Sequence, residues 1–329
     1  MKKLVIIGNG FDIAHNLKTS YWDFREFLKK EREQFLYAFE RMYNIFPPDF
    51  SDPRMGADAE ERWNKKIKSI LWEEFETEIG KPNIAEMLDA SESILEQMDL
   101  DGGNIGIEDT MDEYWRLEYG FVQKFQLYVK EWIEKISTNH VKPIKDGIID
   151  DEESFYMSFN YTDTLENVYH IENVLHIHGG VDRVSWVEPI MGHCNTKDIE
   201  YYKNKAIEAD ECFDEGSASI NHAVVNYLKS IYKNTDKIIE ANIPFFDKLK
   251  DVEEVTVIGW SAGQADIPYL KKIFESIMEN TVWHVYWYDN KAKTSLIAAF
   301  DEVGIPNKNR NFRKSSEYWM KKLTMLNES

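Results

Sequence analysis

The sequence predicts an α/β protein: a parallel sheet flanked by helices, with a large α-helical insertion after the first strand. Residues 4–7 form a short, wholly apolar, β-branched run that ends at Gly8, which is typical of a buried strand in a parallel sheet. Comparable runs return only after about residue 150. In between, apolar residues recur at helical spacing among many lysines and glutamates, which indicates amphipathic helices.

The later strands are expected to be short and rich in β-branched or aromatic residues. They are predicted at residues 154–159, 173–177, 252–258 and 281–288. Helices are predicted at residues 267–278, with Pro268 in the first turn where its missing N–H does no harm, and at residues 292–300. Strands that alternate with helices favour a parallel sheet with both faces covered.

These elements predict a domain organisation. Residues 1–18 and 150–303 are expected to form the α/β core, with a polar helical elaboration at about residues 197–245. Residues 19–149 are expected to be the helical insertion, and residues 304–329 a basic, polar C-terminal tail.

Composition narrows the class of protein. The 329 residues include 59 acidic and 39 basic side chains, for a formal net charge of -20, so nucleic acid is a disfavoured partner. Two cysteines, Cys194 and Cys212, are too few for a disulfide scaffold or a four-thiolate zinc site. The apolar run after Lys2 and Lys3 is too short for a signal peptide, and no other stretch approaches the length of a membrane span. We therefore expect a cytoplasmic protein with no membrane association.

The first chemical motif is the turn from Gly8 to Asp12. Glycines after a buried strand let the backbone approach a ligand, and a helix that begins there presents N–H groups to an anion. The third glycine of the usual dinucleotide fingerprint is missing. The turn is thus either a phosphate cradle or an ordinary tight turn.

The second motif, residues 158–166, follows a predicted strand and precedes a predicted helix, at the edge where open α/β sheets bind ligands. Thr162, Asp163 or Thr164 could simply cap that helix. Capping leaves Asn160 unexplained, and an Asn side chain can donate and accept, as needed to hold a sugar hydroxyl or a water.

The third motif contains His176 and His178, followed by two glycines. Strand alternation predicts that both rings lie on one face at the strand's end. With His193 they could hold a metal, but no acidic ligand follows at a recognisable spacing. Acid–base chemistry by a strand-terminal histidine is the favoured interpretation.

The fourth motif, residues 259–263, has the Gly-x-Ser-x-Gly pattern of a nucleophile elbow around Ser261. A hydrolase triad needs a later histidine, and the only one, His284, lies within a predicted strand. We therefore interpret this segment as a second glycine–serine turn that contacts a ligand.

In this order, the four motifs resemble the AbiH family of bacterial abortive-infection, anti-phage proteins. The resemblance is carried by residues 6–15, 71–76, 159–166, 176–179 and 259–270. The helical insertion and the polar stretch match only at residues 71–76. The resemblance implies a role in phage defence.

The same blocks are similar, more distantly, to the sirtuin-like, Rossmann-like fold of several phage-defence NAD hydrolases. That resemblance implies that the first turn cradles phosphates, that Asn160 and Asp163 position the ribose and a water, and that His178 is the general base. The implied catalytic residues are Asn160, Asp163 and His178. The implied cofactor-binding residues are Gly8, Asn9, Gly10, Phe11, Asp12, His15, Gly259, Ser261 and Asp266.

The resulting expectation is an anti-phage protein that binds NAD and cleaves the nicotinamide–ribose bond on infection, without a metal. Asp, Asn and neutral His groups suit the oxocarbenium-like transition state of that cleavage. By analogy, a phage-derived trigger and a homo-oligomer are expected. The alternatives are a metal-assisted hydrolase of another nucleotide or of nucleic acid, and a non-catalytic nucleotide sensor. Trp72 and Phe75 are expected in a helix core, while Glu76 could be core or a cleft carboxylate.

Overall fold

The computed structural model describes residues 2–89, 107–144, 154–180 and 187–320. The chain forms two compact units, each built from separate stretches of sequence. The first unit comprises Met1–Ser20, Lys130–Ile190 and Asn234–Ser329, and the second comprises Tyr21–Val129 and Met191–Lys233.

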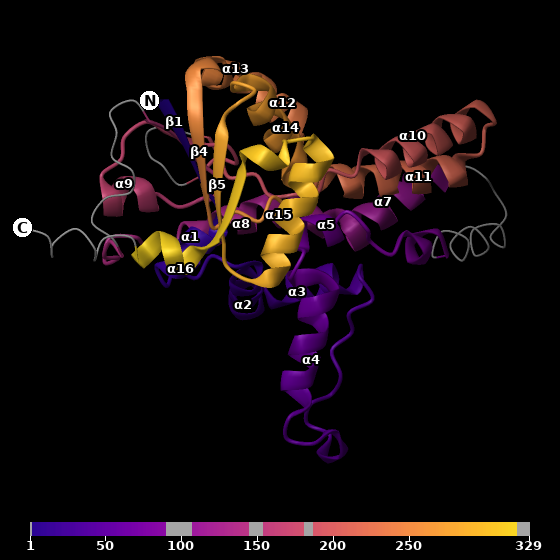
Figure 1. The fold of residues 1–329 in the computed structure, drawn as a ribbon. Helices are drawn as coiled ribbons and strands as arrows, with labels where there is room; N and C mark the ends of the chain where they lie inside the picture. Colours follow the sequence, from indigo (N-terminus) through magenta and orange to yellow (C-terminus); the bar gives the residue numbers. More distant parts are fainter. Residues whose placement is uncertain (1, 90–106, 145–153, 181–186, 321–329) are drawn as a thin grey trace, which may run out of the picture. The chain divides into compact units, whose positions relative to one another are not determined.

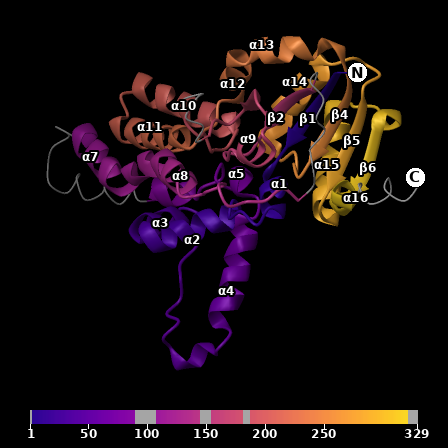
Figure 2. The same ribbon diagram turned by 90° about the vertical axis from the view of Figure 1, so that its left-hand side faces the viewer.

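The first unit contains a six-stranded, all-parallel sheet in the order β3-β2-β1-β4-β5-β6, and the predicted fold class is confirmed. Figure 2 shows β2, β1, β4, β5 and β6 in that order across the sheet. This is the Rossmann-like order, in which β2 and β3 are added on one side of β1 and β4, β5 and β6 on the other, so the strand order reverses between β1 and β4. The strands are β1 (Lys2–Ile7), β2 (Ser154–Ser158), β3 (Val174–His176), β4 (Val252–Ile258), β5 (Val282–Trp287) and β6 (Arg310–Lys314).

Helices pack on both faces of this sheet. Alternation along β1 sends Leu4 and Ile6 into a larger core that includes residues of α14 and α15. Val5 and Ile7 enter a smaller core with residues of α1, α9 and α16. Burial on both faces explains why β1 is a continuous apolar run. The helices of this unit are α1 (Asn9–Ala14), α9 (Thr164–Tyr169), α12 (Thr235–Ala241), α13 (Ile243–Phe246), α14 (Ile267–Ser276), α15 (Asn290–Val303) and α16 (Ser315–Met320), with the short helices η4 (Asp247–Asp251), η5 (Gln264–Asp266) and η6 (Asn307–Asn309).

The second unit is helical in its described part. Its centre is a cluster of aromatic rings in which Trp72 stacks on Phe75 with 4.7 Å between ring centroids. Both side chains are buried, so their predicted place in a helix core is confirmed. The elements are α2 (Tyr21–Glu31), α3 (Glu33–Arg41), η1 (Pro53–Met55), α4 (Ala59–Ile67), η2 (Lys68–Trp72), α5 (Phe75–Glu78), α7 (Ile107–Tyr119), η3 (Gly120–Lys124), α10 (Thr196–Glu211) and α11 (Glu215–Ser230); α8 (Phe125–Ile133) crosses the boundary between the units.

Glu76, whose role the sequence leaves open, belongs to an ion pair in the second unit. Its Oε2 accepts a hydrogen bond from Nζ of Lys233 at 2.9 Å. The Lys233 side chain is completely buried. A buried ammonium group needs a carboxylate partner, so this contact accounts for Glu76 as the counter-ion of Lys233.

The two compact units divide the chain differently from the predicted domains in three places. In the polar stretch 197–245, α10 and α11 group with the second unit, while α12 and α13 group with the sheet. Described residues 130–144, predicted in the insertion, belong to the sheet unit. The predicted tail, residues 304–329, contributes β6 and α16 to that unit. Because β6 is an edge strand with Phe312 as its one apolar residue, its sequence lacks the signal of a buried strand.

Among the described residues, no helix combines the length and the apolar character needed to cross a lipid bilayer.

The place of β6 in the sheet predicts unequal effects of two neighbouring substitutions. Phe312 packs against the larger core, with its ring 5.6 Å from that of Phe300, whereas Asn311 is exposed. Phe312→Ala is expected to lower the free energy of unfolding by about 2 kcal/mol, and Asn311→Ala by less than about 0.5 kcal/mol. Urea denaturation measures both; equal effects would contradict the assignment of β6.

Candidate functional site

Two glycine turns meet where the strand order reverses, after β1 and after β4. The amide of Gly8 donates to the carbonyl of Ile258 at 3.0 Å, and the amide of Gly10 donates to that of Gly259 at 2.8 Å. Gly259 has a φ of +67°, and a Cβ on it would lie 2.3 Å from the backbone nitrogen of Phe11. Close contact between the two turns therefore requires glycine. The amide of Phe11 also donates to a protein carbonyl, so the tight-turn interpretation accounts for the motif.

Below these turns, Asp12 is a fully buried carboxylate. It accepts hydrogen bonds from the hydroxyls of Thr162 at 2.5 Å and Thr164 at 2.8 Å, which links the turn after β1 to the loop after β2. Burial raises the pKa of the Asp12 carboxyl to about 6 from its usual 3.8. The two threonines, the nearby Asn160 amide and the charge of His176 act in the opposite direction and lower this pKa.

Asn160 lies in the same loop with its main chain fixed. Its backbone N–H donates to Oγ of Ser158 at 3.1 Å, and its backbone carbonyl oxygen lies 3.0 Å from Nδ1 of His176. The residue is only 3% exposed. Its side-chain amide acts on the neighbouring Asp12 carboxyl, but neither its nitrogen nor its oxygen reaches regular hydrogen-bond geometry with a described residue. Because an unsatisfied buried amide is costly, such a group marks a place where a ligand or water can complete the bonding.

The two histidines of the third motif have different neighbours. Nε2 of His176 lies 2.7 Å from a carboxylate oxygen of Glu166. The strand ends at His176, and His178 lies in the following turn, where its ring packs against Phe159 and Tyr269. The prediction that both rings share one strand face is therefore wrong, because strand alternation stops before His178.

His178 has an acidic neighbour that the sequence did not reveal. Its Nε2 lies 3.5 Å from Oδ1 of Asp266, and Oδ2 of Asp266 accepts a hydrogen bond from Nε1 of Trp260 at 2.9 Å. Trp260 in turn stacks on Phe159 at 4.4 Å between ring centroids. A hydrogen bond thus holds Oδ2 of Asp266, while Oδ1 faces the His178 ring at ion-pair distance. Ser261, in the same turn as Trp260, is exposed.

Other predicted site residues are engaged elsewhere in the first unit. The carboxylate of Asp163 accepts from the Thr138 hydroxyl at 2.6 Å, so the acidic group beside Asn160 is Asp12. The side-chain oxygen of Asn9 accepts from the Thr19 hydroxyl at 2.5 Å.

Phe11 and His15 lie in an aromatic group beneath the first turn. The ring nitrogens of His15 lie 2.8 Å from the carbonyl oxygen of Phe11 and 2.6 Å from the hydroxyl of Tyr169. Phe11 is fully buried and belongs to the smaller core. Burial lowers the pKa of His15, which favours its neutral form.

In the described residues, His176, His178 and His193 do not form a metal site. His193 belongs to the second unit, where its Nε2 lies 3.0 Å from the Leu228 carbonyl and its Nδ1 accepts from the amide of Asn195. Burial lowers the pKa of His193 to about 4. Across residues 2–89, 107–144, 154–180 and 187–320, no group of three or more His, Cys, Asp or Glu side chains is placed to hold a metal ion.

The strand order and the polar side chains at the carboxyl edge define a Rossmann-like α/β protein whose candidate ligand site lies at the reversal of strand order. A model of the family described as bacteriophage abortive infection AbiH matches residues 4–287, and the chain belongs to this family. Membership indicates a role in anti-phage abortive infection. Neither the curated proteins nor the solved structures compared with this chain include a match. The relationship to sirtuin-like proteins stays a prediction.

The contact between the turns predicts that alanine substitution destabilises the protein at Gly259 but has little effect at Gly263, in the same motif. Gly259→Ala forces a positive φ and a backbone clash, so it is expected to lower the free energy of unfolding by at least about 2 kcal/mol. A Cβ on Gly263 meets no atom within 4 Å, and Gly263→Ala is expected to change stability by less than about 1 kcal/mol. Thermal and urea denaturation of both variants test this, and a harmless Gly259→Ala would refute it.

Asp12 predicts a pH-dependent stability. Because folding raises the pKa of this carboxyl to about 6, its contribution is most favourable below its unfolded pKa and is lost as pH rises through 6. Asp12→Asn removes this dependence. When the pH is lowered from 8 to 5, the free energy of unfolding of the wild-type protein is expected to rise by about 1 kcal/mol relative to that of Asp12→Asn. Urea denaturation of both proteins at both pH values measures this change. If Asp12 had the same pKa in the folded and unfolded states, the difference between the two proteins would be the same at pH 8 and pH 5.

Proposed function

We propose that this protein binds NAD at the carboxyl edge of its sheet and hydrolyses the nicotinamide–ribose bond as its anti-phage action. The observation that supports the proposal best is the buried Asn160 amide, whose polar atoms have no regular hydrogen bond within the described residues. Ribose hydroxyls both donate and accept, so they match the two halves of an amide. The family's role in abortive infection fits an activity that removes an essential nucleotide.

The proposal also includes the other contacts of such a ligand. The amides of Gly8 and Gly10 are bonded within the protein, so we assign the phosphate contact to the exposed Ser261 hydroxyl in the adjoining turn. Asp12 has no exposed surface, and its role is to hold Thr162 and so the loop that carries Asn160.

His178 is assigned as the general base. A proton on Nε2, which faces Asp266, leaves the lone pair on Nδ1. A water oxygen then bonds to C1′ of the ribose while the C1′–N bond breaks. The electron pair of the C1′–N bond leaves with nicotinamide. The water proton passes to Nδ1, and Asp266 stabilises the resulting imidazolium. The products are nicotinamide and ADP-ribose.

The test measures NAD, nicotinamide and ADP-ribose by mass spectrometry in cells that express the protein, with and without phage. Infected cells supply any phage-derived trigger. His178→Ala and Asn160→Ala are each expected to slow NAD loss at least about 100-fold, because each removes a group that acts on the reacting ribose or water. Loss of phage protection should accompany loss of turnover.

Two matched variants serve as controls. His170→Ala changes an exposed histidine after α9, and Asn311→Ala changes an exposed asparagine in β6; both should keep wild-type turnover. Protection that persists in His178→Ala, or protected cells whose NAD is unchanged, would overturn the proposal. Saturable NAD binding without turnover would assign the protein as a nucleotide sensor instead.

A further inference from the structure

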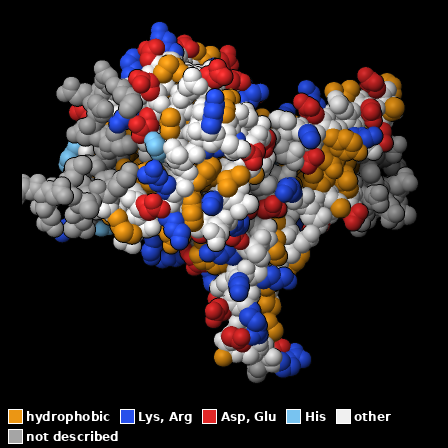
Figure 3. Space-filling model, viewed as in Figure 1, with side chains coloured by type: hydrophobic (Ala, Val, Ile, Leu, Met, Phe, Trp, Pro, Cys, Tyr) orange, Lys and Arg blue, Asp and Glu red, His pale blue; other side chains and the backbone are white. Residues whose placement is uncertain are grey.

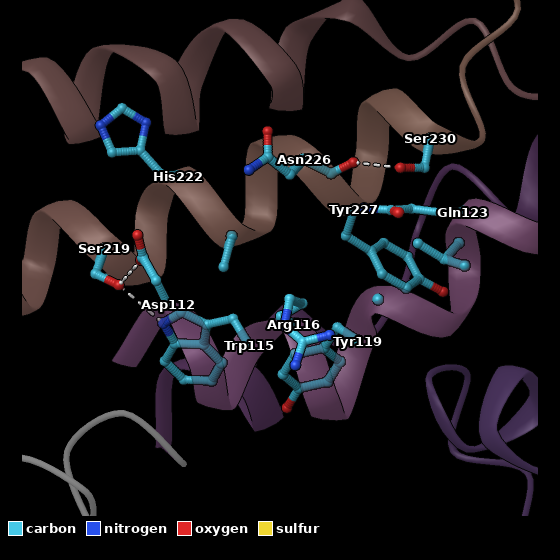
Figure 4. A pocket seen from close by; sticks show the side chains of 13 residues that line it. Asp112, Trp115, Arg116, Tyr119, Gln123, Ser219, His222, Asn226, Tyr227 and Ser230 are labelled. Atoms are coloured by element: carbon cyan, nitrogen blue, oxygen red, sulfur yellow. Dashed lines mark hydrogen bonds between the residues drawn. The ribbon is translucent and has the colours of Figure 1, made fainter. Parts of the chain in front are cut away.

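The second unit contains a groove that takes no part in the site described above. It lies between α11 on one side and α7 with η3 on the other, and its volume is about 420 Å³ (Figure 4). The rings of Trp115, Tyr119 and Tyr227 line it, and all three side chains are largely buried. Figure 3 shows hydrophobic side chains gathered over α7 and α11. The groove thus offers an aromatic surface with polar groups beside it.

The charged groups of the groove leave an excess of negative charge. The guanidinium of Arg116 donates two hydrogen bonds to its helical neighbour Glu113, at 2.6 and 2.7 Å. Nε2 of His222 lies 3.2 Å from a carboxylate oxygen of Asp210. Asp112, by contrast, has no cationic side chain within ion-pair distance among the described residues. Both basic groups of the lining already face a carboxylate, so the local field attracts a cation.

The Asp112 carboxylate is held in place from below. Its Oδ1 accepts a hydrogen bond from the Ser219 hydroxyl at 2.8 Å, and Oγ of Ser219 accepts one from Nε1 of Trp115 at 3.0 Å. Figure 4 shows this chain of contacts between the two helices. The bonds fix a carboxylate next to an aromatic ring. Ring faces and carboxylates both attract ammonium and guanidinium groups.

We propose that this groove binds an organic cation of the alkylammonium or guanidinium class, with its charge at Asp112 and its apolar stem on the aromatic surface. The volume lies in the range of pockets that enclose small ligands. Two sources present this chemistry: a lysine or arginine side chain of a protein segment, and a free polyamine. The groove is a binding site independent of NAD turnover.

Isothermal titration calorimetry of the full chain, at low and at physiological salt, tests the proposal with two probes. One is spermidine, and the other is the acetylated and amidated tripeptide Gly-Lys-Gly. We expect saturable binding that weakens as salt rises. Tighter binding of the tripeptide identifies a protein segment as the source, and tighter binding of spermidine identifies a free polyamine. Absence of saturable binding of both probes at millimolar concentration overturns the proposal.

Three variants locate the binding. Asp112→Asn keeps an oxygen for the Ser219 hydroxyl but removes the charge, and is expected to weaken binding at least about tenfold. Glu211→Gln makes the same change of charge at the exposed end of α10, outside the lining, and should alter binding by less than about twofold. Equal weakening by these two variants would show only general attraction to an acidic surface, against the proposal.

Ala223→Arg keeps the test decisive if Asp112→Asn does not fold. Ala223 lines the groove from α11, and an arginine there places a guanidinium inside it. This variant is expected to abolish binding of both probes. Binding that survives unchanged in Ala223→Arg overturns the proposed site.

Discussion

The sheet unit depends on backbone contact between two turns at the reversal of strand order. Gly8 and Gly259 follow adjacent strands, and their turns approach so closely that a single added carbon on either would overlap the other. Hydrogen bonds from Gly8 and Gly10 close this contact. This contact sets the distance between the carboxyl ends of β1 and β4, and it thereby positions the turn that contains Trp260 and Ser261. The glycines serve the architecture first, and the ligand site is built around them.

Around that contact the structure concentrates polar groups in a buried place. Asp12 and Asn160 are both nearly inaccessible. Asp12 accepts hydrogen bonds from two threonine hydroxyls, whereas the Asn160 side-chain amide acts on Asp12 without reaching regular hydrogen-bond geometry. A buried polar network is most stable when its members are bonded, and this incompletely bonded amide is the reason for proposing Asn160 as a ligand contact. His178 and Asp266 form a second buried polar pair, with 3.5 Å between Nε2 and Oδ1.

The sequence predicts the buried strands because continuous apolar runs such as β1 reflect burial on both faces. It misses β6, since an edge strand keeps one side in solvent and needs few apolar residues. It identifies Asn160 and His178 as candidates from their position after strands. It does not reveal that Asp12 pairs with Thr162, or His178 with Asp266, because the partners lie far apart in the chain and no local spacing encodes these contacts.

The strand order also constrains when the protein can fold during synthesis. Lys3 of β1 pairs with Ser154 on one side and Glu254 on the other, so β1 is not paired along both edges until β2 and β4 have both been made. Because β4 spans Val252–Ile258, most of the described chain is made before the second edge of β1 can pair. Such long-range pairing slows folding and exposes sticky surface on the way. The length of chain between β1 and its two partner strands therefore limits how early the sheet can form.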